Sequence, residues 1–117
     1  MSQFNIGSKA FTAGEAMEAY RRVKLSTGSG TQVEYADAGD AFIGFTAAAV
    51  NLGEMVSVIL KNTGMTFKVV ANGVIAVGGN FYGAIDGKVS ATVSGTIQGR
   101  VLEAAAADGE IVEAILL

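Results

Sequence analysis

The sequence contains no cysteine, histidine, proline or tryptophan among its 117 residues. Without cysteine, the chain has no disulfide framework, no thiolate metal site and no sulfur nucleophile. Without histidine, it lacks the commonest metal ligand and the usual general base near neutral pH. These two absences exclude the Ser-His-Asp and Cys-His catalytic arrangements.

Charge is also scarce, because charged residues make up 16% of the chain, below the ~25% of an ordinary soluble domain. The net charge is −3, so we expect no nucleic-acid partner, which would require a clustered basic surface. Half of the residues are hydrophobic, which indicates either a generous core or an oligomer. No apolar run approaches the ~18 residues of a membrane span, so we expect no membrane partner.

The N-terminal stretch is polar and lacks the basic and apolar regions of a signal peptide. We therefore expect synthesis in the cytoplasm of the cell that expresses the chain. We assign residues 1–13 to an extended N-terminal arm and residues 14–117 to a single domain.

Glycine is abundant, with 16 residues, and separates short segments rich in Val, Ile, Phe, Tyr and Thr. Such segments are typical of strands, and turn signals about every ten residues favour a sandwich or barrel. The sequence therefore predicts an all-β fold, a small compact β-barrel with at most one short helix. The candidate for that helix is Leu102–Asp108, which contains four successive alanines.

Two hairpins are predicted. The first joins Glu54–Lys61 to Met65–Ala71, and the second joins Phe81–Ile85 to Lys88–Val93. The second turns at Asp86-Gly87, a dipeptide typical of the type I′ turn.

One pattern occurs twice in the chain. Gly44-Phe45-Thr46-Ala47 leads to Gly53-Glu54 and an apolar strand, and Gly99-Arg100-Val101-Leu102 leads to Gly109-Glu110 and another. This echo indicates a repeated supersecondary unit within one barrel. The alternative is that Gly-Glu is merely a favourable junction between a turn and a strand.

The closing segment, Glu110–Leu117, is apolar on both of its faces. A strand of this kind is covered on both faces. In so small a protein, the second cover could come from a neighbouring subunit.

Carboxylates are the remaining candidates for chemistry, and Asp37 and Asp40 lie three residues apart in a turn. Paired catalytic carboxylates come from separate strands around a cleft, and a calcium loop needs more oxygen ligands in a fixed order. The glycine clusters match no phosphate-binding motif. We therefore predict no catalytic residue, no metal site, no cofactor and no enzymatic activity.

Two sets of residues are candidates for contact with a partner. The densest basic cluster is Arg21, Arg22 and Lys24, and Phe4 and Phe11 are aromatic residues in the predicted arm. Aromatic residues in an arm are suited to docking on a partner. The alternatives are that the basic cluster is a solvated strand face and that the arm folds back on its own barrel.

Several motifs, taken in order and spacing, resemble the small bacteriophage capsid-cement, or head-decoration, proteins. The resemblance covers roughly residues 13–117. The motifs are Tyr35-Ala36-Asp37-Ala38-Gly39-Asp40, Ile43-Gly44-Phe45, Gly53-Glu54, Gly73-Val74-Ile75, Phe81-Tyr82, Asp86-Gly87-Lys88-Val89, Gly99-Arg100-Val101-Leu102 and Asp108-Gly109-Glu110-Ile111-Val112.

The resemblance implies a compact β-barrel or β-tulip, often trimeric, on the outer surface of the phage head. The implied partner is the major capsid protein, whose adjacent subunits the protein would clamp together, and the implied location is the virion. The residues expected to contact the capsid are then Phe4, Phe11, Arg21, Arg22 and Lys24. Two alternatives stay open, a tail or baseplate β-module and a small carbohydrate- or ligand-binding module.

Overall fold

The computed structural model describes residues 7–117, which form ten strands and one short 3₁₀ turn. The prediction of a compact all-β fold is confirmed, and the described residues contain no α-helix. No helix in this part of the chain is long and apolar enough to cross a membrane. The strands are β1 (Ser8–Ala13), β2 (Arg22–Leu25), β3 (Gln32–Tyr35), β4 (Gly44–Thr46), β5 (Met55–Leu60), β6 (Phe67–Val70), β7 (Asn80–Gly83), β8 (Val89–Ser90), β9 (Gly99–Val101) and β10 (Ile111–Leu116), and the turn is η1 (Ile85–Gly87).

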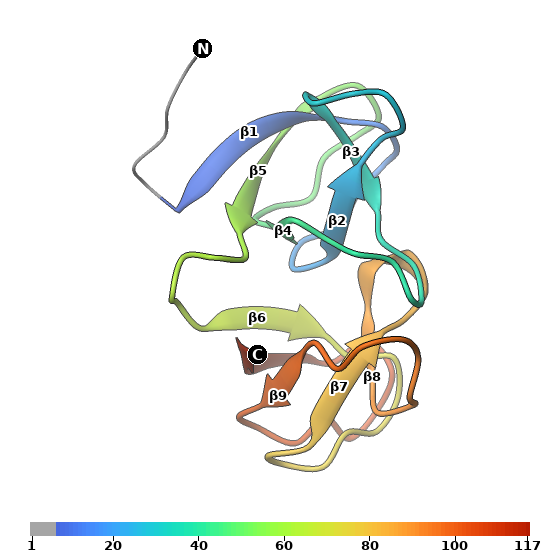
Figure 1. Ribbon diagram of the computed structural model, residues 1–117, viewed down its shortest axis with the longest axis vertical. Coiled ribbons are helices and arrows are strands. Elements are labelled where there is room, and N and C mark those ends of the chain that lie inside the picture. Colours follow the sequence, from blue (N-terminus) through green and yellow to red (C-terminus); the bar gives the residue numbers. More distant parts are fainter. Residues whose placement is uncertain (1–6) are drawn as a thin grey trace.

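The first five strands form a closed barrel in the order β1-β3-β2-β4-β5, which occupies the upper part of Figure 1. The barrel closes because β5 pairs antiparallel with β1, and β1 pairs parallel with β3. Inward-facing side chains alternate with outward-facing ones along the strands, as in any small barrel. Its core includes Phe11, Val23, Val33, Val56 and Val58, all of them buried.

The last five strands form a second sheet in the order β6-β10-β9-β7-β8, the lower part of Figure 1. Its two edge strands, β6 and β8, approach each other at the isolated parallel bridge between Ala71 and Val89. The second sheet is therefore half a barrel, whose edge strands meet at a single bridge and form no ladder.

The two sheets are copies of one unit, and we call β1 to β5 with their loops the first half and β6 to β10 with theirs the second half. The first can be written β3-β2-β4-β5-β1 and the second β8-β7-β9-β10-β6, which is the same order of corresponding strands. An isolated antiparallel bridge joins Met17 to Val50 in the first half and Ile75 to Ala105 in the second. The repeat seen in the sequence is therefore structural, but each copy lies in its own sheet and not in one barrel.

A glycine begins the fourth strand of each copy for the same reason. A Cβ atom on Gly44 would lie 2.2 Å from the Ile59 carbonyl oxygen, and one on Gly99 would lie 2.2 Å from that of Ile115. No side chain fits at such a distance, so both positions need the close backbone approach that glycine permits.

The predicted boundary between an arm and a domain at residue 13 is wrong. Ser8–Ala13 is β1, which pairs with both β3 and β5 inside the closed barrel. Phe11 lies opposite Val56 and is buried in the barrel core. Inward-facing Phe11 and Ala13 alternate with polar residues over too few positions to reveal a strand in the sequence. Phe4 lies outside the described residues.

The first predicted hairpin is also wrong. β5 and β6 do not pair, because the edges of β5 are occupied by β1 and β4. Residues 61–66 instead carry the chain from the barrel to the second sheet, between the β5 and β6 labels of Figure 1. A turn-forming sequence between two apolar strands marks a connection, but it does not show whether those strands pair.

The second hairpin is confirmed. β7 and β8 pair antiparallel, and Asp86 and Gly87 between them have positive φ values of 56° and 73°. Positive φ at both central positions is the requirement of a type I′ turn, and it explains the Asp-Gly dipeptide. The candidate for a short helix, Leu102–Asp108, is a loop with an isolated bridge at Ala105.

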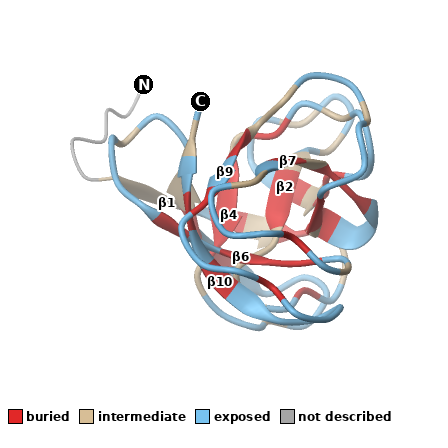
Figure 2. Cartoon of the chain, turned by 90° about the horizontal axis from the view of Figure 1, so that it is seen from below, coloured by how far each residue is buried: buried red, intermediate tan, exposed pale blue. Residues whose placement is uncertain are grey.

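The two halves meet through aromatic side chains. Phe42 and Phe45 of the first half are buried in the same cluster as the core of the second half. The ring of Phe45 lies 5.3 Å from that of Phe42 and 5.0 Å from that of Phe67 on β6. In Figure 2, buried stretches on β2, β4 and β6 lie at the centre of the molecule, and exposed loops surround them.

Candidate interaction surface

Arg22, one of the predicted contact residues, is fully buried where the two halves meet. Its Nη2 atom donates hydrogen bonds to the carbonyl oxygens of Ala36, at 2.9 Å, and Ala84, at 2.8 Å. Its Nε atom donates to the carbonyl oxygen of Lys88 at 3.1 Å. Ala36 belongs to the first half, and Ala84 and Lys88 belong to the second, so Arg22 joins the two.

The second half is shaped around this side chain. A Cβ atom on Gly83 would lie 2.9 Å from the Nη1 atom of Arg22, and one on Gly87 would lie 2.6 Å from its carbonyl oxygen. Burial lowers the pKa of Arg22 to about 10, against the opposing effect of Asp40 and Asp37. The guanidinium is therefore still charged at neutral pH, and backbone carbonyls solvate it in place of water.

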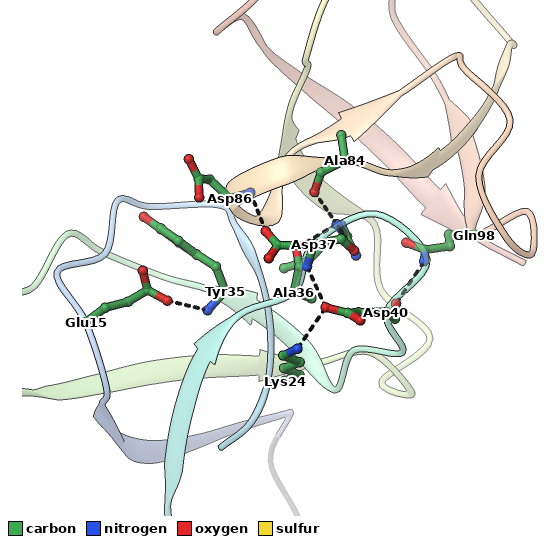
Figure 3. A network of polar contacts seen from close by, with 10 residues as sticks. Glu15, Lys24, Tyr35, Ala36, Asp37, Asp40, Ala84, Asp86 and Gln98 are labelled. Carbon is green, nitrogen blue, oxygen red and sulfur yellow. Dashed lines mark hydrogen bonds and ion pairs between the residues drawn. The ribbon is translucent and has the colours of Figure 1, made fainter. Parts of the chain in front are cut away.

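Further polar contacts join the loop after β3 to the turn η1, and Figure 3 shows those of Asp37, Asp40 and Asp86. The Asp37 carboxylate accepts a hydrogen bond from the Asp86 backbone N–H at 3.0 Å, and Gly87 N–H donates to the Ala36 carbonyl at 3.0 Å. Arg21 Nη1 donates to the Asp86 carbonyl at 2.9 Å. The loop after β3 and the turn η1 are thus held together by several hydrogen bonds, not by one residue.

Lys24 forms an ion pair with Asp40, with 2.8 Å between Nζ and Oδ2. The same carboxylate accepts a hydrogen bond from the Asp37 backbone N–H at 2.9 Å. The hydrogen bond that Lys24 donates to Asp40, followed by that from the Asp37 backbone N–H, lowers the pKa of Asp40. The same hydrogen bond to Asp40 raises the pKa of Lys24. Asp40 therefore caps its own turn and anchors a strand, as aspartate commonly does.

The structure describes four of the five predicted contact residues, all except Phe4, and it separates them. Phe11 and Arg22 are buried, so in this fold they offer no surface to a partner. Arg21 and Lys24 are partly exposed, although both have intramolecular partners. The role of Arg22 was missed because the sequence gives no sign that a second half covers the outer face of its strand.

The acidic residues form no metal centre. Among residues 7–117, no group of three or more acidic side chains is placed to hold an ion.

A groove of about 600 Å³ lies at the junction, lined by Phe42, Gln98, Leu116 and their neighbours. The Nζ atom of Lys61, another lining residue, lies 4.8 Å from the centroid of the Phe42 ring.

Comparison with known proteins gives a fold relative. The chain is similar to a solved structure described as the head fiber gp8.5 N base in bacteriophage phi29, with a TM-score of 0.80. The match covers 94% of this chain and 92% of that chain, at 23% sequence identity. No protein-family model matches the sequence, and no curated protein matches it either. The shared fold extends over both halves of the molecule.

Proposed function

We propose that this protein is a structural component of a bacteriophage head, bound to the outer surface of the capsid. The observation that carries the proposal is the likeness of its fold, over 94% of the chain, to the base of a phage head fiber. The motifs that resemble head-decoration proteins, taken from the sequence alone, support the same function.

The finer proposal is that the protein cements adjacent subunits of the major capsid protein and acts as a homotrimer. Cementing requires a rigid body and many repeated contacts, and it requires no chemistry. The barrel, the aromatic junction and the buried Arg22 give a rigid body. A trimer would bind the capsid more tightly than one copy, because the binding of its first subunit raises the effective concentration of the other two at their sites.

The proposed role is structural and not enzymatic. The groups with shifted pKa values, among them Arg22, Lys24 and Asp40, are engaged in contacts that hold the fold together. The ligand-binding alternative depends on the three tyrosines, which could stack on a carbohydrate. Tyr35 is buried, and its hydroxyl accepts a hydrogen bond from the Glu18 backbone N–H at 2.7 Å, whereas Tyr20 and Tyr82 are partly exposed. No observation favours the tail-module or ligand-binding alternatives.

The test is co-sedimentation of the purified protein with expanded, undecorated heads of the phage that encodes it, and with unexpanded heads as a control. We expect saturable binding to expanded heads at a fixed ratio to the major capsid protein. Absence of binding to both forms would overturn the proposal.

A further inference from the structure

One end of the molecule carries a group of exposed apolar side chains. Val74, Val77 and Leu102 have 70%, 68% and 44% of their surface exposed. They belong to two loops at the lower end of Figure 1, and Figure 2, which views the molecule from below, shows much of the chain there as exposed. We name this surface the apolar end, and its members are Val74, Ala76, Val77, Leu102, Ala104 and Ala106.

The backbone holds the two loops side by side. Ile75 and Ala105 exchange two hydrogen bonds, at 3.0 and 2.9 Å, and Gly78 N–H donates to the Val101 carbonyl at 2.9 Å. Val77 and Leu102 directly adjoin this last pair in the sequence. The apolar end is therefore one ordered surface made by two paired segments.

The first half contains the same two loops without the large apolar side chains. Met17 and Val50 exchange the corresponding hydrogen bonds, and Tyr20 N–H donates to the Thr46 carbonyl as Gly78 does to Val101. By this correspondence, Ala16, Ala19 and Ala47 occupy the positions of Val74, Val77 and Leu102, and Glu18 occupies that of Ala76. The loops of the repeat thus fold with alanine at these positions, and the exposed valines and leucine are not needed for packing.

Most of the charged side chains around the apolar end are acidic, and the basic ones are Lys88 and Arg100, which donates a hydrogen bond to Asn80. Residues 71–80 contain no charged side chain, and residues 101–110 contain only Glu103, Asp108 and Glu110. Lys88 is paired with Asp108, at 3.1 Å. A two-fold contact between copies through this surface would bring carboxylates together, which is unfavourable. A partner that is apolar at its centre and basic at its rim fits better.

We propose that the apolar end is the surface that docks on the phage head, against an apolar patch of the capsid exterior bordered by lysine or arginine side chains. This inference rests on the proposed function and assigns the contact to the second half. Exposed apolar patches with a polar border mark interaction sites in soluble proteins. The contact does not involve the basic cluster around Arg22, which is engaged within the molecule.

The test compares two variants in the head co-sedimentation assay. The triple variant V74A/V77A/L102A gives the second half the alanines that the first half already has, so we expect an unchanged circular dichroism spectrum. We expect head affinity to fall on the order of 100-fold, because three partly buried contacts are lost. The matched control, L52A/M55A, removes exposed apolar side chains of the first half, 68% and 60% exposed, and should bind like the wild type.

The outcomes are distinct. If the wild-type protein does not bind heads, the proposed function fails. If the wild type and the triple variant bind equally well, the docking surface is wrong although the function stands. If sedimentation velocity shows that the triple variant changes the oligomeric state, the apolar end is a contact between copies, and the docking proposal is overturned.

Discussion

The two halves of this protein share one strand order but differ in how they close. In the first half, β1 pairs with β3 at two positions, and the barrel has its own core around Val23 and Val33. In the second half, the two edge strands are joined by one bridge between Ala71 and Val89, and β8 has two residues. The core of the second half is shared with Phe42 and Phe45 of the first. One copy of a repeated unit can therefore fold without a full ladder between its edge strands when the other copy contributes side chains to its core.

The positions at the junction have also diverged. Phe45, which lies opposite Ile59, corresponds to Arg100, which lies opposite Ile115. Phe45 is buried by the second half, whereas nothing among residues 7–117 covers Arg100 in the same way, and its side chain is exposed. For a substitution at the junction, the corresponding residue in the other half therefore provides a matched control substitution.

The largest expected effect comes from Phe45. Replacing it with alanine removes a ring that packs on Phe42 and Phe67, so we expect the free energy of unfolding to fall by about 3–5 kcal/mol. The corresponding variant, Arg100→Ala, should change it by less than about 0.5 kcal/mol. Urea denaturation followed by circular dichroism measures both. Equal losses would contradict the claim that the second half covers Phe45 and that Arg100 has no such cover.

Arg22 should come next. Arg22→Ala leaves the carbonyls of Ala36, Ala84 and Lys88 without this donor, and we expect a loss of about 3 kcal/mol. Asn80, the corresponding residue, is exposed and accepts one hydrogen bond from Arg100, so Asn80→Ala should cost much less. Urea denaturation measures both losses. If Arg22→Ala left the free energy of unfolding unchanged, Arg22 would not be needed to hold the two halves together.

Gly44 and Gly99 should behave alike, because they lie where the two copies have kept the same geometry. Gly44→Ala and Gly99→Ala each place a Cβ atom against a carbonyl oxygen, and we expect each to destabilise by about 1–3 kcal/mol. Thermal unfolding of the two variants provides the measurement. If one substitution were harmless, the two fourth strands would not be equivalent.

The smallest effect concerns pH and the ion pair of the first half. The pKa of Asp40 is lowered in the folded protein, so its contribution to stability is present above its ordinary value of 3.8. That contribution is lost as the pH falls through the lowered value of the folded state. Asp40→Asn should therefore reduce stability slightly at pH 7, and the difference from the wild type should shrink as the pH falls below 3.8, measured by urea denaturation. Because the pair is partly exposed, added salt should weaken the difference.

Sequence patterns predicted the strands better than their partners. The predicted segments Glu54–Lys61, Met65–Ala71, Phe81–Ile85, Lys88–Val93 and Glu110–Leu117 each overlap a strand, and the Asp86-Gly87 turn is present, because these features follow from local propensity. The repeat is also present, because its motifs recur in the sequence. The division into two sheets was not predictable, since pairing depends on which strand edges are already occupied. The burial of Phe11 and Arg22 was missed for the same reason, because each is covered by segments distant in the sequence.

The most direct test of the account is a cryo-electron microscopy reconstruction of expanded heads saturated with the protein. The account predicts ordered density on the outer surface, with the loops that carry Val74, Val77 and Leu102 facing the capsid. Density with the first half against the capsid would contradict the assignment of the docking surface. Absence of ordered density on the head would contradict the proposed function itself.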